Sequence, residues 1–316
     1  MKVVVLLGGR SSEHEISLES GRSVAGELRA RGHAVEEVVL PRGESWLPDA
    51  AAQAALRAAD VVFPALHGPF GEDGTVQGLL ELAGVPYVGP GVAASALAMD
   101  KDLFKSVMRD KGVPVTRNVT LRGGEAAESP FGFPVFVKPA RLGSSVGITK
   151  AHDEDELRRA VALALLHDEK VLVEELVEGT EVEVGVLGNR DPDVSLPGEI
   201  VVRTGEWYDY AAKYEAGGME LVVPPRLPAA QIERVRELAR EAFVASECEG
   251  MARVDMFVRA GDGRVLVNEL NTIPGFTATS VYAKLFEASG LPYGELLERL
   301  CALALERHAR RRALRH

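Results

Sequence analysis

Three side chains with oxygen donors are predicted to converge late in the sequence. Glu269 and Asn271 lie two residues apart in an apolar run, so on a β-strand they would point to the same side of the sheet. A turn at Gly261-Asp262-Gly263 connects this run to another alternating run and places Asp255 on the neighbouring antiparallel strand. Carboxylate and amide oxygens are the ligands that Mg²⁺ prefers, and a cation would neutralise a buried Glu269. The pattern predicts a magnesium site, and the alternative is a pair of surface acids on an edge strand.

Basic and hydroxyl side chains that could bind phosphate lie earlier in the sequence. Lys138 is part of a strand pattern, and Lys101 begins a predicted helix, where a cation opposes the helix dipole. An anionic ligand would explain both placements, and a solvated edge is the alternative for either lysine. The loop Gly143-Ser144-Ser145 could cover phosphates with its N–H groups and hydroxyls, although it could also be a plain turn. Arg253 shares the strand face of Asp255, where it could stabilise negative charge on a reacting oxygen.

Composition and missing motifs exclude several classes of protein. Neither G-x-x-x-x-G-K-[ST] nor G-x-G-x-x-G occurs, which argues against P-loop and dinucleotide-binding proteins. The net charge of -11 argues against a general nucleic-acid surface. No apolar run approaches the roughly 20 residues that cross a bilayer, and the short run Val3–Leu7 is interpreted as a first strand. We therefore expect no nucleic-acid or membrane partner and a cytoplasmic protein, with Cys248 and Cys301 as free thiols.

The elements that would position these side chains alternate in type over residues 1–98. Strands are predicted at Val3–Leu7, 33–40, 60–66 and 87–89, and helices at 17–31, 75–83 and 93–98. Such alternation indicates a parallel sheet with helices on both faces and ligands beyond the carboxyl ends of its strands. The loops that begin at Gly8 and His67 lie at such ends.

Two further units are predicted after residue 98. Residues 99–179 form a small α+β unit, with a helix before Pro114, strands at 134–139 and 171–177, and a helix that begins after Asp153 with Glu156 as a capping box. Residues 180–316 form an antiparallel unit. Its predicted strands lie at 181–188, 195–202, 252–259 and 264–270, with a helix at 228–249 and a long polar stretch at 203–218. The predicted fold class is therefore mixed α/β and α+β, in three domains.

Several separated stretches together resemble the D-alanine:D-alanine ligase family of the ATP-grasp superfamily. They occur in the expected order and span nearly the whole chain: LLGGRSSEHEISLESG, ALHGPFGEDGTVQGLLEL, MDKDLFK, VKPARLGSSVGI, VLVEELVEGTEVEV, EWYDYAAKY, RVDMF and NELNTIPGFTATS. The resemblance implies an ATP-grasp architecture. Residues 1–98 would be a Rossmann-like, substrate-binding domain, residues 99–179 the small central domain, and residues 180–316 the antiparallel catalytic domain.

The resemblance also implies a reaction. Such ligases phosphorylate the carboxylate of one D-alanine with ATP, and the amine of a second D-alanine then attacks the acyl phosphate. Phosphorylation supplies the leaving group that a carboxylate lacks. The products are ADP, phosphate and D-alanyl-D-alanine, a peptidoglycan precursor. Two Mg²⁺ ions, which Mn²⁺ can replace, and a homodimer are implied as well.

The resemblance assigns nucleotide roles residue by residue. Lys101 and Lys138 would hold the α and β phosphates, the loop at Ser144 and Ser145 would close over them, and Lys213 would reach the γ-phosphate. The adenine edge would be Glu174 with the backbone of Glu175 to Val177. Glu181 would bind the ribose, Asn268 would contact the nucleotide, and the metal ligands would be Asp255, Glu269 and Asn271.

Substrate roles follow in the same way. Glu13 would pair with the ammonium of the first D-alanine, with His67 beside it, and a hydrogen-bonded set of Glu13, Ser144 and Tyr214 would connect the domains. Arg253 and the backbone of Gly275 would form an oxyanion hole. Ser280 and Val281 would bind the second D-alanine, with Ser280 at its carboxylate.

Two features bear on alternatives. The pair Lys213-Tyr214 favours an amine nucleophile over D-lactate. Leu142, in the predicted phosphate loop, replaces a glutamate that some members of the family carry, so the contacts between that loop and the long loop are left open at this position. One alternative is another ATP-grasp carboxylate–amine ligase or a D-alanine:D-lactate ligase. The other is an ATP-grasp protein that binds nucleotide without turnover.

Overall fold

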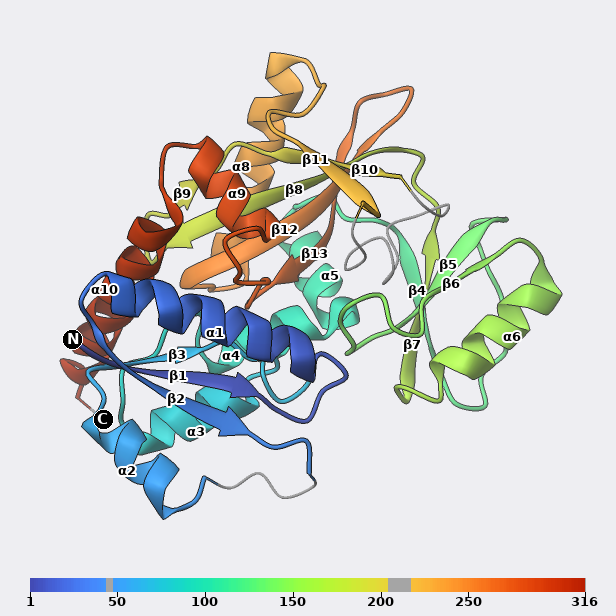
Figure 1. Cartoon of the computed structure of the whole chain (residues 1–316). Helices are drawn as coiled ribbons and strands as arrows, with labels where there is room; N and C mark the ends of the chain where they lie inside the picture. The colour runs from blue at the N-terminus through green and yellow to red at the C-terminus, as the bar shows by residue number, and fades with distance from the viewer. Residues whose placement is uncertain (44–47, 204–216, 316) are drawn as a thin grey trace.

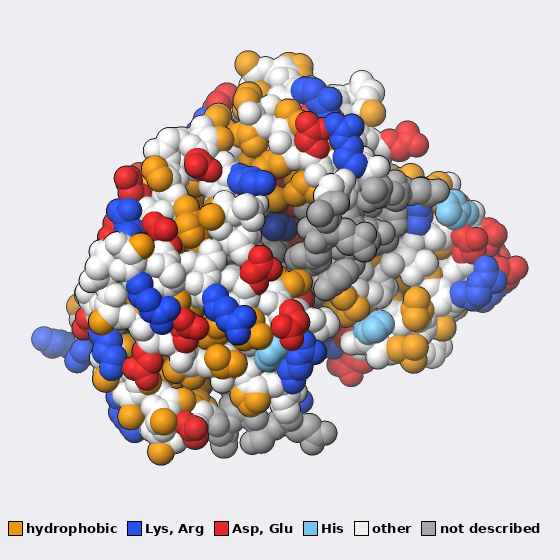
Figure 2. All heavy atoms as spheres, in the orientation of Figure 1, with side chains coloured by type: hydrophobic (Ala, Val, Ile, Leu, Met, Phe, Trp, Pro, Cys, Tyr) orange, Lys and Arg blue, Asp and Glu red, His pale blue; other side chains and the backbone are white. Residues whose placement is uncertain are grey.

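The computed structural model describes residues 1–43, 48–203 and 217–315 (Figure 1). Within them the chain forms three sheets, the first parallel and the other two antiparallel. This is the mixed α/β and α+β class that the sequence predicts. No helix in the described ranges is long and apolar enough to cross a membrane. On the face shown in Figure 2, acidic and basic side chains are intermixed.

The first sheet has the strand order β2-β1-β3, all parallel. Its region comprises β1 (Lys2–Gly8), α1 (His14–Ala30), β2 (Ala34–Leu40), α2 (Ala50–Ala58), β3 (Val61–Pro64), α3 (Thr75–Ala83) and α4 (Val92–Met99). Alternate side chains of β1 enter two different cores, because successive residues of a strand point to opposite faces. Val3 and Val5 pack on the α1 side, and Val4 and Leu6 on the side of α2 and α3 (Figure 1).

The predicted strand at 87–89 is wrong. Tyr87 makes only an isolated bridge to Val62. Pro86 has no N–H to donate, and Gly89 has a φ of 93°, which turns the chain away. The ladder therefore stops after one pair.

The second sheet has the order β4-β7-β5-β6 and is antiparallel throughout. Its region comprises α5 (Lys101–Asp110), β4 (Asn118–Arg122), β5 (Val135–Pro139), β6 (Thr149–Ala151), α6 (Glu154–Ala164) and β7 (Lys170–Glu175). Asp153 caps α6 by accepting from the Glu156 N–H at 2.8 Å. The Glu156 carboxylate accepts from the His152 N–H rather than from Asp153, so half of the predicted capping box is confirmed.

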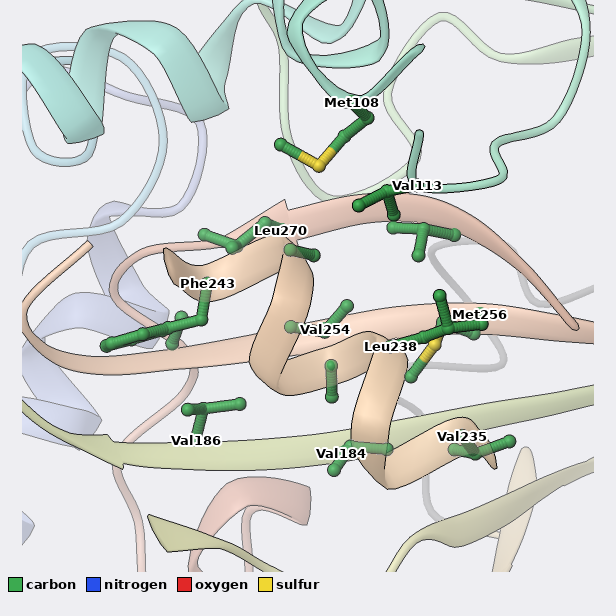
Figure 3. Close-up of a cluster of buried hydrophobic side chains, with 14 of the residues drawn as sticks. Met108, Val113, Val184, Val186, Val235, Leu238, Phe243, Val254, Met256 and Leu270 are labelled. Atoms are coloured by element: carbon green, nitrogen blue, oxygen red, sulfur yellow. The ribbon is translucent and has the colours of Figure 1, made fainter. Parts of the chain in front are cut away.

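The third sheet has the order β11-β10-β8-β12-β13, with β9 on β8. Its region comprises β8 (Gly179–Gly188), β9 (Asp193–Val194), β10 (Gly198–Val202), β11 (Met219–Val222), α8 (Ala229–Ala245), β12 (Gly250–Arg259), β13 (Val265–Asn271), α9 (Val281–Ala288) and α10 (Tyr293–Arg312). One face of the sheet packs against α8 and α5, as Figure 3 shows for Val184, Val254, Leu238 and Met108. The intervening strand residues project from the opposite face, and they include the polar side chains Glu183, Arg253 and Asp255.

Candidate active site

Two cavities meet at Glu269. One, of about 390 Å³, lies between the second and third sheets, and its lining includes Lys138, Glu174 and Asp255. The other, of about 300 Å³, is lined by α1, the loop after β3 and the loop after β13. Glu269 lines both cavities. A group bound at Glu269 would therefore contact the occupants of both.

The predicted oxygen donors are brought together by strand register. Asp255 lies directly opposite Glu269 in the β12–β13 ladder, and Arg253 lies opposite Asn271. The amide oxygen of Asn271 is buried and has no hydrogen-bond donor among the described residues. A buried oxygen without a partner is costly, so this atom fits a cation or a ligand donor. Among the described residues, no group of three or more His, Cys, Asp or Glu side chains could hold a metal ion.

A β-bulge in β13 supplies a fourth polar residue. The register shifts between Asp255, opposite Glu269, and Met256, opposite Val267, which leaves Asn268 as the extra residue. As a result the consecutive residues Asn268 and Glu269 both line the larger cavity.

Basic side chains lie against these acids and balance their charge. The Lys101 ammonium lies 3.2 Å from a Glu269 oxygen and donates to the Leu142 carbonyl at 2.8 Å. Arg253 donates to both oxygens of Asp255, at 2.7 and 2.6 Å, and its Nε lies 2.9 Å from the buried Glu183. Cationic groups therefore lie at both predicted metal carboxylates.

Glu174 is shared by two lysines at the floor of the larger cavity. Its carboxylate accepts from Lys105, and its other oxygen lies 2.5 Å from Lys138. Burial alone would raise the pKa of Glu174, but the two lysines lower it to about 2. Burial lowers the pKa of Lys105 to about 8, an effect that the charge of Glu174 opposes. The carboxylate is thus held ionised at neutral pH.

Glu13 lies at the start of α1 and accepts a hydrogen bond from the Ser144 hydroxyl, as the predicted network requires. The loop that carries His67 lies against it. Gly68 has a φ of 71°, and a Cβ there would lie 2.6 Å from a Glu13 oxygen, so this position requires glycine. Tyr214 and Lys213 lie outside the described residues.

His67 is buried and held on both sides of its ring. Nδ1 lies 3.1 Å from the Ile273 carbonyl, and Nε2 lies 3.0 Å from the Ser20 hydroxyl. Ser20 also accepts from the Phe276 N–H at 3.2 Å, which ties α1 to the loop after β13. Burial by itself would lower the pKa of His67, but Glu72 and Glu13 raise it overall.

The end of the smaller cavity is formed by the loop into α9. A Cβ on Gly275 would lie 3.2 Å from the Ser280 hydroxyl, which crowds any larger residue there. Ser280 is the N-cap residue of α9, and its hydroxyl accepts from the Thr277 N–H at 3.0 Å. Val281 is the first residue of the helix and lines the same cavity. The positive end of α9 is thus close to the space where an anionic group would fit.

Comparison with known proteins decides the family. The model "D-ala D-ala ligase C-terminus" matches residues 107–302, and "D-ala D-ala ligase N-terminus" matches residues 2–59 and 48–90. The chain belongs to the D-alanine–D-alanine ligase family. A D-alanine–D-alanine ligase of Solibacter usitatus is 46% identical and covers 100% of this chain and 98% of its own. One of Deinococcus radiodurans is 45% identical, with coverages of 96% and 98%.

Solved structures agree. The D-alanine-D-alanine ligase from Coxiella burnetii superposes with a TM-score of 0.86 at 35% identity, covering 99% of this chain and 96% of that one. The VanG D-Ala:D-Ser ligase from Enterococcus faecalis superposes with a TM-score of 0.83 at 35% identity, with coverages of 96% and 99%. The ATP-grasp fold predicted for this ligase family is therefore confirmed.

The structure also places the remaining predicted nucleotide residues of this ligase-family chain. Ser145, Glu175, Val177 and Glu181 line the larger cavity together with Lys138 and Asn268. The Glu175 carboxylate accepts from the Arg117 N–H at 2.9 Å, which fixes the strand end beside the cavity. Their roles in binding stay predictions.

Sequence reasoning missed two kinds of residue. The apolar walls of the larger cavity, Phe136, Ile148 and Phe257, were not predicted. Neither was Lys105, although its spacing of four from Lys101 and three from Met108 places all three on one helical face. That periodicity was the signal that could have found it.

Proposed function

We propose that the protein joins two molecules of D-alanine into D-alanyl-D-alanine, with ATP as the phosphoryl donor, in the synthesis of peptidoglycan precursors. The observation that carries the proposal is the position of Glu269, which lines both cavities and lies opposite Asp255. This arrangement lets a nucleotide in one cavity meet an amino acid in the other. Membership of the ligase family supports the same reaction.

In the first step a carboxylate oxygen of one D-alanine bonds to the γ-phosphorus of ATP, and the bond to the ADP oxygen breaks. We assign Lys101 and Lys138 to the α and β phosphates. Lys213 would bind the γ-phosphate, and the loop at Ser144 and Ser145 would cover the nucleotide. Glu174, Glu175, Val177 and Glu181 are proposed to bind its adenosine half, and Asn268 is proposed to contact the nucleotide.

Asp255, Glu269 and Asn271 would hold two Mg²⁺ ions, or Mn²⁺ in their place, whose positive charge would neutralise the phosphates. The buried amide oxygen of Asn271, which lacks a donor among the described residues, supports this assignment.

In the second step the amine of the other D-alanine bonds to the acyl carbon, loses a proton, and phosphate leaves. Glu13 would hold the ammonium of the first D-alanine, with His67 behind it and the Ser144–Tyr214 pair closing the network. Arg253 and the N–H of Gly275 would stabilise the oxyanion. Ser280 and Val281, at the start of α9, would receive the carboxylate of the second D-alanine.

We also propose three domains, at 1–98, 99–179 and 180–316; each contains one of the three sheets, except that Gly179, the first residue of β8, falls before the last boundary. The described helices include none that could span a membrane, and we propose a cytoplasmic enzyme that acts on small molecules. A homodimer is proposed because the resemblance to the ligase family implies one. Light scattering of the purified chain would test the dimer.

A coupled assay of ADP release tests the proposed reaction. D-alanine should drive ADP release in the presence of Mg²⁺, and D-alanyl-D-alanine should accumulate in equal amount. D-lactate, D-serine and L-alanine are the discriminating second substrates, because the similar VanG structure is that of a D-Ala:D-Ser ligase. Absence of D-alanine-dependent ADP release would overturn the proposal, and preferred release with D-serine would reassign the second substrate.

A further inference from the structure

Lys105 is a fully buried lysine that touches the machinery without lining either cavity. It lies on α5 with 0% of its surface exposed. Its ammonium donates to the Glu174 carboxylate and to the Thr116 hydroxyl. Glu174 and Thr116 line the larger cavity, whereas Lys105 does not. Any effect of Lys105 on a ligand must therefore pass through these neighbours.

Glu174 has two cationic partners where one would satisfy its charge. Lys105 contacts one carboxylate oxygen, and Lys138 lies 2.5 Å from the other. The two ammonium groups on this carboxylate repel each other. Moving one lysine away from Glu174 therefore costs less while the other lysine stays in place. Removal of both would leave an unpaired buried carboxylate, which is strongly unfavourable.

The two lysines differ in how easily their ammonium groups could move away from Glu174. Lys105 is enclosed and held by a second acceptor, Thr116. Lys138 lines the cavity, and its other contacts are weaker: 3.3 Å to the amide oxygen of Asn268, on the bulge beside the proposed metal site, and 5.9 Å to the centroid of the Phe136 ring. Lys138 is therefore the partner that can be exchanged.

We propose that Lys105 is a positioning residue: it is the permanent counter-ion of Glu174, and it allows Lys138 to turn from Glu174 to a phosphate of the bound nucleotide. This inference rests on the proposed function for the identity of the ligand as an adenine nucleotide. It adds a role for a residue that makes no contact with that ligand. Without Lys105, Lys138 would have to stay with Glu174.

The first test compares ligands with and without phosphates in Lys105→Met, using the full chain. The dissociation constant of ADP, from isothermal titration calorimetry, should rise at least about tenfold. That of adenosine, from saturation-transfer NMR, should change by less than about threefold. Lys111→Met, at the exposed end of the same helix, is the matched control and should change neither. Equal losses for both ligands, or an unchanged ADP affinity, would overturn the proposal.

A second comparison should show no further loss of ADP affinity when Lys105 is replaced. Glu174→Gln removes the charge that retains Lys138, so Lys105→Met combined with Glu174→Gln should bind ADP within about threefold of Glu174→Gln alone. A further tenfold loss on adding Lys105→Met would overturn the proposal, and this comparison holds even if Lys105→Met alone fails to fold. Because binding of ADP is measured without D-alanine, a wild-type chain that binds ADP but forms no dipeptide would refute the proposed function only.

Discussion

At the scale of single residues, the two carboxylates of the proposed metal site are distinguished by their surroundings. Glu269 faces both cavities and lies 3.2 Å from Lys101, whereas Asp255 is 3% exposed and bonded to Arg253. We expect Glu269→Gln to lower kcat by about 100-fold or more, because the lost charge weakens binding of the cation that neutralises the phosphates. A titration of turnover with Mg²⁺ checks this, and an unchanged kcat at low Mg²⁺ would contradict it.

Ser280 gives a prediction that separates the two substrates. Ser280 is the N-cap residue of α9 and lines the smaller cavity but not the larger one. Ser280→Ala should raise KM for the second D-alanine by about tenfold, through loss of one hydrogen bond to a carboxylate, while KM for ATP stays nearly constant. Ser289→Ala, at the other end of the helix, is the control. Equal effects on the two KM values would refute the role.

The sequence predicted these residues because strand geometry is local. Spacing of two placed Glu269 and Asn271 on one face, and the hairpin placed Asp255 across from them, as the ladder confirms. Lys105 and Glu174 are 69 positions apart in the sequence. Helix and strand periodicity relates only residues that are close in sequence, so it could not predict this contact. Cys248 and Cys301 are free thiols, as predicted, and the structure shows that both are buried.

At the scale of elements, α1, whose N-cap residue is Glu13, packs closely on β1. Gly21 faces β1, and a Cβ added there would lie 2.5 Å from the Leu7 Cβ. Gly21→Ala should therefore lower the free energy of unfolding by about 1–3 kcal/mol through overpacking. Urea unfolding measures this.

Gly26 on the same helix is the matched control. A Cβ there meets nothing within 4 Å, so Gly26→Ala should raise the free energy of unfolding by about 0.5–1 kcal/mol through helix propensity. If the two substitutions had the same effect, the packing argument for Gly21 would be wrong.

Element boundaries were predicted well where apolar periodicity is strong and poorly where one residue interrupts a ladder. The helix at 75–83 and the strands of the hairpin agree with the structure, whereas the helix predicted to reach residue 249 ends at Ala245. The bulge at Asn268 was not predicted. One extra residue leaves a regular alternation of side chains both before and after it, so the sequence pattern still looks like a continuous strand. The polar stretch at 203–218 lies largely outside the described residues.

At the scale of the whole molecule, the order of the three sheets was predictable, because alternating strands and helices give a parallel sheet and consecutive strands an antiparallel one. How the sheets face one another was not predictable from patterns. The two cavities depend on that arrangement, since each is lined by residues from widely separated parts of the chain. The resemblance to a known family, rather than periodicity, predicted how the three parts of the chain combine around a common site.

The free energy of unfolding should depend on pH through the titration of Glu174. Its pKa in the folded protein is about 2, against 4.5 for the ordinary group, because Lys105 and Lys138 outweigh the effect of burial. A lowered folded pKa stabilises the native state above pH 4.5, and this contribution is lost as the pH falls toward 2.

Between pH 5 and pH 3, the free energy of unfolding of the wild type should therefore fall by on the order of 2 kcal/mol more than that of Glu174→Gln. Urea unfolding at fixed ionic strength across this range measures the difference. Glu178→Gln, an exposed glutamate just beyond β7, is the matched control and should follow the wild-type slope. Parallel curves for wild type and Glu174→Gln would show that the two lysines do not hold this carboxylate ionised, and the exchange of partners proposed for Lys138 would lose its electrostatic basis.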